Sequence, residues 1–111
     1  MAHNLITIKK RSTFLHIKKN GKFIRSNSFN IQLLNDIELN NVISIGYTAT
    51  KRLGNAVIRN KSKRRMRELA RKVISKYGKI NFYYVLIAKS QLLKKTFKEL
   101  ELELEKIIKR N

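Results

Sequence analysis

The sequence contains no cysteine, no proline and only four glycines among its 111 residues. Without cysteine the chain has no disulfide bond, no thiolate zinc site and no thiol nucleophile, and it fits a reducing, intracellular setting. Without proline, and with so little glycine, it has no segment of linker composition and no low-complexity tract. We therefore expect one domain over residues 1–111, a length at which a single core buries roughly two thirds of the unfolded surface.

Long apolar runs are missing as well. No stretch approaches the ~20 residues of a membrane span. The first residues, MAHNLITIKKRS, are too short and too broken in their apolar part for a secretory signal. We expect a soluble, cytoplasmic protein that does not bind a membrane.

Acidic residues are scarce. Seven Asp and Glu stand against 26 Lys and Arg, which gives a formal net charge of +19 at pH 7. Self-repulsion of this size destabilises a compact chain, so we expect the protein to function beside a polyanion. A hydrophobic content of 42% nevertheless predicts a folded core and not a disordered basic tail.

The positive charge is concentrated in one segment. Four of the seven acids are glutamates at alternate positions from 99 to 105, where a solvated helix face explains them. Residues 51–72 hold ten basic side chains and the single acid Glu68. Arginine forks bind phosphate oxygens in pairs, so this segment predicts a nucleic-acid surface. The ten basic residues are Lys51, Arg52, Arg59, Lys61, Lys63, Arg64, Arg65, Arg67, Arg71 and Lys72.

Hydrophobic spacing predicts three helices. The strongest pattern runs from about residue 55 to residue 77, where apolar positions recur at helical spacing until Gly78 ends the helix. A capping box at Thr96 and Glu99 opens a further helix, and a short helix is expected over residues 12–20. The apolar positions of the long helix are Met66, Leu69, Ala70, Val73, Ile74 and Tyr77.

Three segments predict strands. Residues 28–33 and 42–48 alternate between apolar and polar side chains, whereas residues 82–88 are continuously apolar and suit a strand covered on both faces. We expect the first two strands to be antiparallel neighbours with one polar face. The element order predicts an α+β fold, a two-layer α/β sandwich in which a small, mostly antiparallel sheet packs with three helices.

Catalytic groups are few. Outside the last helix the only acids are Asp36, Glu38 and Glu68, and Glu68 stands at helical spacing from four basic residues as a salt-bridging spacer. Neither His3 nor His16 has a partner group in the pattern. We therefore expect no catalytic residue and no metal ligand in this chain, and a binding protein whose chemistry is supplied by a partner.

Asn60 lies among the cations of the basic segment. Its amide can hydrogen-bond a base edge or a sugar, which would make it part of a nucleic-acid surface. It can equally cap the helix that the segment forms. Both interpretations stand on the sequence.

The segment KRLGNAVIRNKSKRRMRE, residues 51–68, resembles the hallmark of the bacterial ribonuclease P protein component. That family shows a basic pair, then Gly-Asn-Ala-Val, then Arg-Asn-Arg, Lys-Arg and Arg-Glu. Weaker similarity extends over nearly the whole chain. It includes the first helix, the strand at Phe29, the pair Ile45-Gly46, the run from Tyr84 to Ala88 and the closing helix.

The resemblance implies a function. Such proteins are the small subunit of a ribonucleoprotein endonuclease that removes the 5′ leader of precursor tRNA, while the RNA subunit carries the catalytic site and most of its Mg²⁺. It implies one copy of this chain for each ribonuclease P RNA and no active site in the protein. It also implies a left-handed strand-helix-strand crossover, against the general rule.

The resemblance also implies RNA contacts along the basic segment. Lys61 stands where the family usually has arginine, which keeps the charge but loses the bidentate fork. The residues expected to contact RNA are Lys51, Arg52, Asn55, Arg59, Asn60, Lys61, Lys63, Arg64 and Arg67.

The family binds the leader in a cleft between its first helix and the open face of the sheet. Phe14 is either a stacking platform there or part of the core, and Ser44 belongs to the same polar alternation. Lys18 and Gln32 stand where the family often has aromatic residues, which predicts a grip based on charge and hydrogen bonds. The expected cleft residues are Phe14, Lys18, Asn30, Gln32, Gly46, Thr48 and Lys89.

Two other functions are compatible with a small basic chain. One is a structural RNA-binding protein of the ribosome, a class of equally small α/β proteins. The other is a nuclease that acts without RNA, which the shortage of catalytic groups disfavours.

Overall fold

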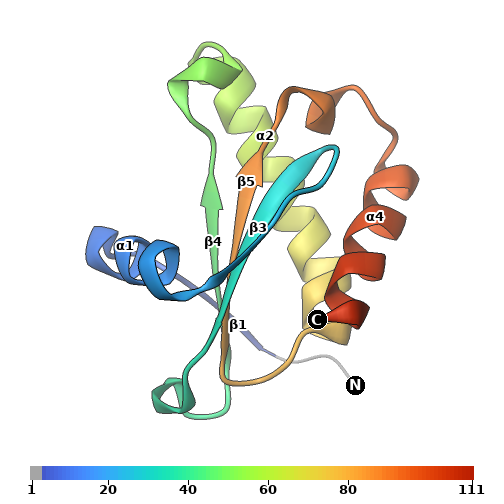
Figure 1. The fold of residues 1–111 in the computed structure, drawn as a ribbon. Coiled ribbons are helices and arrows are strands. Elements are labelled where there is room, and N and C mark those ends of the chain that lie inside the picture. The colour runs from blue at the N-terminus through green and yellow to red at the C-terminus, as the bar shows by residue number, and fades with distance from the viewer. Residues whose placement is uncertain (1–3) are drawn as a thin grey trace.

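The computed structural model describes residues 4–111 and contains a five-stranded sheet with helices on both faces (Figure 1). The strands are β1 (Leu5–Thr7), β2 (Lys22–Ile24), β3 (Phe29–Asn35), β4 (Ile43–Thr48) and β5 (Phe82–Ala88). The helices are α1 (Arg11–Asn20), α2 (Ala56–Leu69), α3 (Ser75–Tyr77) and α4 (Phe97–Arg110). A π-helical turn, η3 (Ala70–Ile74), joins α2 to α3, and three 3₁₀ turns are η1 (Ile37–Leu39), η2 (Lys51–Leu53) and η4 (Ser90–Leu93).

The sheet has the strand order β1-β4-β5-β3-β2. The α+β fold with three main helices is confirmed, but the sheet is mixed: β4 pairs in parallel with β1 and β5, and β3 pairs antiparallel with β2 and β5. The expectation that residues 28–33 and 42–48 are neighbours is wrong because β5 lies between them. Its continuous apolar run fits this central place, where both faces are covered.

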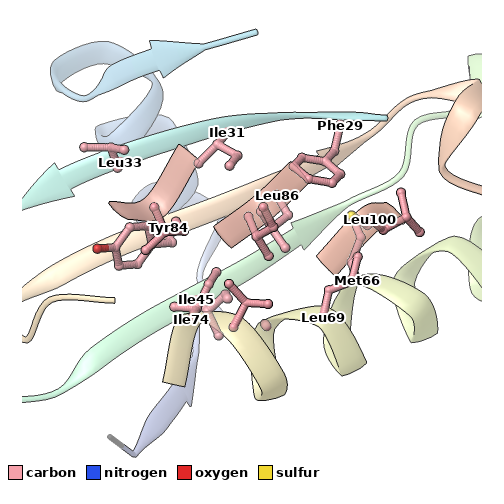
Figure 2. Packing of buried hydrophobic residues seen from close by; sticks show 14 of the residues in the cluster. Phe29, Ile31, Leu33, Ile45, Met66, Leu69, Ile74, Tyr84, Leu86 and Leu100 are labelled. Carbon is pink, nitrogen blue, oxygen red and sulfur yellow. The ribbon is translucent and has the colours of Figure 1, made fainter. Parts of the chain in front are cut away.

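One face of the sheet packs against α2 and α4 and holds the main core (Figure 2). Alternate residues of β3, β4 and β5 point to this face, where they meet the apolar stripes of both helices. The side chains labelled in Figure 2 are Phe29, Ile31, Leu33, Ile45, Met66, Leu69, Ile74, Tyr84, Leu86 and Leu100. Burying this face fixes which residues of the same strands point the other way.

Among the helices of residues 4–111, α1 alone lies on the opposite face, away from α2 and α4 (Figure 1). A small cluster of Ile8, Ile17 and Val85 anchors α1, with Phe14 packed against it. Because α1 has ten residues, much of this face is left outside the helix. Asn30 and Thr48 therefore stay partly exposed on this face, whereas Ser44 is buried.

The long helix predicted over residues 55–77 is present, with the π-helical turn η3 in its C-terminal half. The Asn55 side chain accepts a hydrogen bond from the Ile58 backbone N–H at 3.0 Å and so caps the N-terminus. Gly78 ends the helix, donating its N–H to the Ile74 carbonyl at 2.8 Å. The two short strands β1 and β2 were not predicted, because three residues are too few to show alternation.

The α4 helix begins with the predicted capping box, in which Thr96 and Glu99 satisfy each other's backbone N–H groups. Its glutamates do not all belong to a solvated face. The Glu103 side chain is 15% exposed and accepts hydrogen bonds from the Ser28 N–H at 2.9 Å and the Ser28 hydroxyl at 2.7 Å, and from the Ser26 hydroxyl. Glu103 thus fastens α4 to the turn between β2 and β3.

No helix within residues 4–111 is long and apolar enough to cross a membrane. His3, which the sequence analysis considered as a catalytic group, lies outside the described residues. The left-handed sense of the β4-α2-β5 crossover stays an implication of the family resemblance.

Candidate nucleic-acid interface

The start of α2 presents the basic segment to solvent. Lys51 and Arg52 lie in η2, which turns the chain from β4 into α2, and both are exposed. Ser62, Met66 and Leu69 form the buried line of α2. Helical spacing therefore places the intervening cations on the outer surface. Those exposed cations are Lys61, Lys63, Arg64 and Arg67.

Three of the predicted RNA-contact residues, Asn55, Arg59 and Asn60, differ in how much of their side chain is free to bind RNA. The Asn55 side-chain oxygen is the cap of α2, so only its amino group can donate to RNA. Asn60 is exposed within α2 and does not cap it, so the capping interpretation of Asn60 is wrong. Arg59 is half-buried, and its Nε has no hydrogen-bond partner among the described residues.

Arg65 has a hydrogen-bond partner within the fold, whereas the exposed Glu68 lacks the ion pairs that its spacing predicted. The Arg65 Nη2 donates to the Lys95 carbonyl at 2.8 Å and ties α2 to the loop before α4. Glu68 was predicted to pair with its basic neighbours. Within the described chain the ion pairs are Lys95–Glu103 and Lys109–Glu105, so this prediction is wrong and Glu68 stays a lone exposed acid.

The open face of the sheet forms a groove of about 380 Å³ against α1. The strand register explains which residues meet there: Asn30 pairs with Ile87, which pairs with Thr48, and Gln32 pairs with Val85 and with Phe23. The lining residues are Phe14, Leu15, Lys18, Phe23, Asn30, Gln32, Thr48, Thr50, Val85 and Ile87. Five of the seven predicted cleft residues, Phe14, Lys18, Asn30, Gln32 and Thr48, thus lie together.

Phe14 has both of the roles that the sequence left open. It is half-buried, packs on the cluster that anchors α1, and also lines the groove. A Cβ at Gly46 would lie 2.5 Å from the Phe14 ring. Gly46 therefore makes room for Phe14 and not for a bound strand, which corrects its predicted role.

Two further predictions about the cleft are wrong. Ser44 is buried and does not line the groove. Lys89 follows β5, where its ammonium group donates to the Ser26 carbonyl at 2.8 Å, and its side chain lines a different hollow beside Leu53 and Ile58. The sequence could not show this, because the turn before β3 is positioned by Glu103 from the far end of the chain.

The residue that the sequence missed is Phe23. It lies on the edge strand β2, is 49% exposed and lines the same groove as Phe14. In the sequence Phe23 is a single aromatic residue shortly after Gly21. It cannot be assigned to the groove until β2 is known to pair with β3. The groove therefore contains two aromatic rings together with one lysine and several amide and hydroxyl groups.

Acidic and metal-binding groups are sparse at both surfaces. Within residues 4–111 no three His, Cys, Asp or Glu side chains lie close enough to hold a metal ion. The groove lining contains no carboxylate among its described residues. The described residues of both surfaces thus combine cations with few carboxylates, a composition that suits binding of a polyanion.

Known proteins similar to this chain have names that associate them with ribonuclease P. The family profile described as Ribonuclease P matches residues 3–111. The chain is 32% identical over 110 residues to the ribonuclease P protein component of Gluconacetobacter diazotrophicus, a match that covers 99% of this chain and 94% of that protein. It is 38% identical over 82 residues to that of Caulobacter vibrioides, covering 74% of this chain and about half, 54%, of the relative.

Solved structures with the same fold include two proteins of that description. The RNase P protein of Staphylococcus aureus superposes with a TM-score of 0.77 at 30% identity, covering 94% of this chain and 93% of the other. The RNase P protein of Thermotoga maritima gives a TM-score of 0.81 at 25% identity, with 95% and 96% covered.

Proposed function

This chain belongs to the ribonuclease P protein family, and from that premise we propose that it is the protein subunit of an RNA-based endonuclease that removes the 5′ leader of precursor tRNA. One observation carries the proposal. The groove and the basic segment are joined in the chain, because the groove residues Thr48 and Thr50 are followed directly by the exposed Lys51 and Arg52 of η2. A single RNA assembly can therefore contact both surfaces.

The basic surface of α2 suits the RNA subunit. Exposed lysine and arginine side chains bind phosphate oxygens and release counterions from the RNA. The exposed Asn60 amide can reach a sugar or a base edge, and Arg64 and Arg67 offer planar forks. We propose that one copy of the chain binds one RNA subunit through this surface.

The groove suits a single strand, here the leader. Aromatic rings accept the face of any base, so Phe14 and Phe23 can hold a strand with little sequence preference. Lys18 supplies a charge for the backbone, and Asn30 and Gln32 supply hydrogen bonds. The grip combines stacking with the electrostatic and hydrogen-bonded contacts that the sequence predicted.

The residues that the structure describes do not fit a Mg²⁺ site of their own. Mg²⁺ binds through carboxylates and retained water. Among the described residues of the basic surface and the groove, the only carboxylate is that of Glu68. We propose that Mg²⁺ is held mainly by the RNA subunit and that the protein is not the catalyst. Its cations reduce the repulsion between phosphates and so lower the Mg²⁺ concentration that the assembly needs.

The test is cleavage of a precursor tRNA at low Mg²⁺ with the RNA subunit alone, the protein alone and both together. We expect multiple turnovers only in the combined reaction. Equal cleavage with and without the protein across a Mg²⁺ titration would reject the proposal. Cleavage by protein freed of all carried RNA would instead reject its non-catalytic role.

A further inference from the structure

A hollow lined by two arginines lies between β1 and α2, on the face of the sheet opposite the groove. The edge strand β1 ends at Thr7, which pairs with Ile45, and so stops one pleat before Tyr47. The sheet therefore has no strand beside Tyr47 on that side, and α2 passes over the gap. The resulting hollow has a volume of about 460 Å³. Its lining residues are Asn4, Leu5, Thr7, Ile45, Tyr47, Arg67, Arg71 and Ser75.

Two arginines converge on the Tyr47 side of this hollow. The Arg67 guanidinium carbon lies 5.6 Å from the centre of the Tyr47 ring, which stacks the fork over an aromatic face. Arg71 follows one helical turn later and lines the same hollow. The Ser75 hydroxyl donates to the Arg71 carbonyl, so Ser75 is occupied within the helix.

The charge in this hollow is uncompensated. None of its described lining residues is acidic, and neither arginine takes part in an ion pair within the described chain. Burial raises the pKa of the Tyr47 phenol and the nearby Arg67 and Arg71 charges oppose that rise, so Tyr47 remains a neutral donor at physiological pH. Asn4 and Thr7 add polar groups from β1 and the residue before it.

We propose that this hollow binds a phosphodiester group of the RNA subunit between Arg67 and Arg71. The proposal rests on the proposed function and extends the RNA surface beyond the residues that the family resemblance assigns, since neither Arg71 nor Tyr47 is among them. Two forks one turn apart can clamp the oxygens of one phosphate. The ring of Tyr47 holds the first fork in place, and the polar groups of β1 face the same space.

Lys72 provides a matched control. It is the next residue after Arg71, is exposed and carries the same charge, but its ammonium group lies 5.9 Å from the Phe97 ring on the other flank of the helix. Arg71→Ala and Lys72→Ala each remove one positive charge from the protein. Only Arg71→Ala removes a member of the proposed clamp.

The experiment measures binding of the purified full-length protein to its RNA subunit over a range of salt concentrations. We expect Arg71→Ala to weaken binding about tenfold and Lys72→Ala to have a much smaller effect. Because both arginines hold one phosphate, the double variant Arg67→Ala, Arg71→Ala should reduce the slope of log affinity against log salt by about 0.9 and not by twice that value. Melting temperatures of all variants check that the fold is intact.

Equal effects of Arg71→Ala and Lys72→Ala would overturn the proposal, and so would a slope change in the double variant of about 1.8, the value for two separate phosphates. Loss of affinity only for free precursor tRNA would overturn the assignment to the RNA subunit. Failure of the wild-type protein to bind the RNA subunit would reject the proposed function itself, which separates the two failures.

Discussion

Single side chains determine how the groove can hold RNA, and Phe23 is the clearest case. Lys18 and Gln32 occupy places where the family often has aromatic residues, but the edge strand β2 brings the Phe23 ring beside Gln32. An aromatic surface is thus supplied from a different strand. The Phe23 ring is 49% exposed and lines the groove, so its face is available to a base.

We expect Phe23→Ala to weaken the affinity for precursor tRNA by about 1–3 kcal/mol, the range found for stacking of one base. Binding of the RNA subunit should change much less, because Phe23 lines the groove on the α1 face of the sheet, whereas α2 packs on the other face (Figure 1). Ile37→Ala is the control, since Ile37 is 80% exposed in η1, at the end of the sheet opposite the start of α2 (Figure 1). The measurement is precursor affinity of the assembled enzyme, with a leaderless tRNA for comparison. An equal loss with and without the leader would contradict the stacking role.

Gly46 determines where the Phe14 ring lies. An added methyl group at Gly46 would meet the ring at 2.5 Å, in a place where Ile8 also closes the space. We expect Gly46→Ala to destabilise the protein by about 1–3 kcal/mol through overpacking and to displace the ring into the groove. Thermal unfolding measures the first effect and precursor affinity the second. The double variant Gly46→Ala, Phe14→Leu should recover part of the stability, and no recovery would mean that another contact is limiting.

At the scale of elements, α2 is a rigid support that spaces its cations by its own geometry. We expect Arg64→Ala to lower the slope of log affinity for the RNA subunit against log salt by about 0.9, since one phosphate contact is lost. Arg110→Ala at the end of α4 is the matched control, because it removes the same exposed charge outside the basic surface. An unchanged slope for Arg64→Ala would show that this side chain only interacts with solvent.

The contact between α4 and the β2–β3 turn makes stability depend on pH. Burial raises the pKa of Glu103, but hydrogen bonds from Ser26 and Ser28 and the charge of Lys95 outweigh it and hold the pKa below the usual 4.5. The folded state therefore gains stability that is complete above the usual pKa and is lost as the pH falls through the lowered value. Denaturant titrations should show the wild type losing more stability than Glu103→Gln below about pH 4.5. Parallel losses in the two proteins would assign the acid sensitivity to Glu99 or Glu105.

Elements that carry their own pattern could be predicted from the sequence. The stripe of α2 and the capping box of α4 are local, and the apolar run of β5 predicts a strand covered on both faces, although its place between β3 and β4 was not predicted. What failed depends on partners that are distant in sequence. The hydrogen bond of Lys89 to Ser26, the packing of Phe14 on Gly46 and the place of β2 all arise only when the sheet has formed.

At the scale of the molecule, a net charge of +19 is confined to a body measuring 36 × 30 × 21 Å. Repulsion at these distances opposes folding, so ligands that bind the folded surface stabilise it by mass action. We expect phosphate or sulfate to raise the melting temperature more than chloride does at equal ionic strength. Equal effects of the three salts would show that general screening, and not site binding, relieves the repulsion.

The central place of β5 also determines when the chain can fold during its synthesis. The two neighbours of β5 in the sheet, β3 and β4, do not pair with each other. Before β5 is made, their pairing partners are the three-residue edge strands β2 and β1. The groove, whose lining includes Val85 and Ile87, therefore does not exist until β5 has been synthesised and has paired with its neighbours. Because the basic segment, residues 51–72, precedes β5 in the chain, its cations are synthesised before the groove beside α1 can form, and completion of both surfaces waits for one strand.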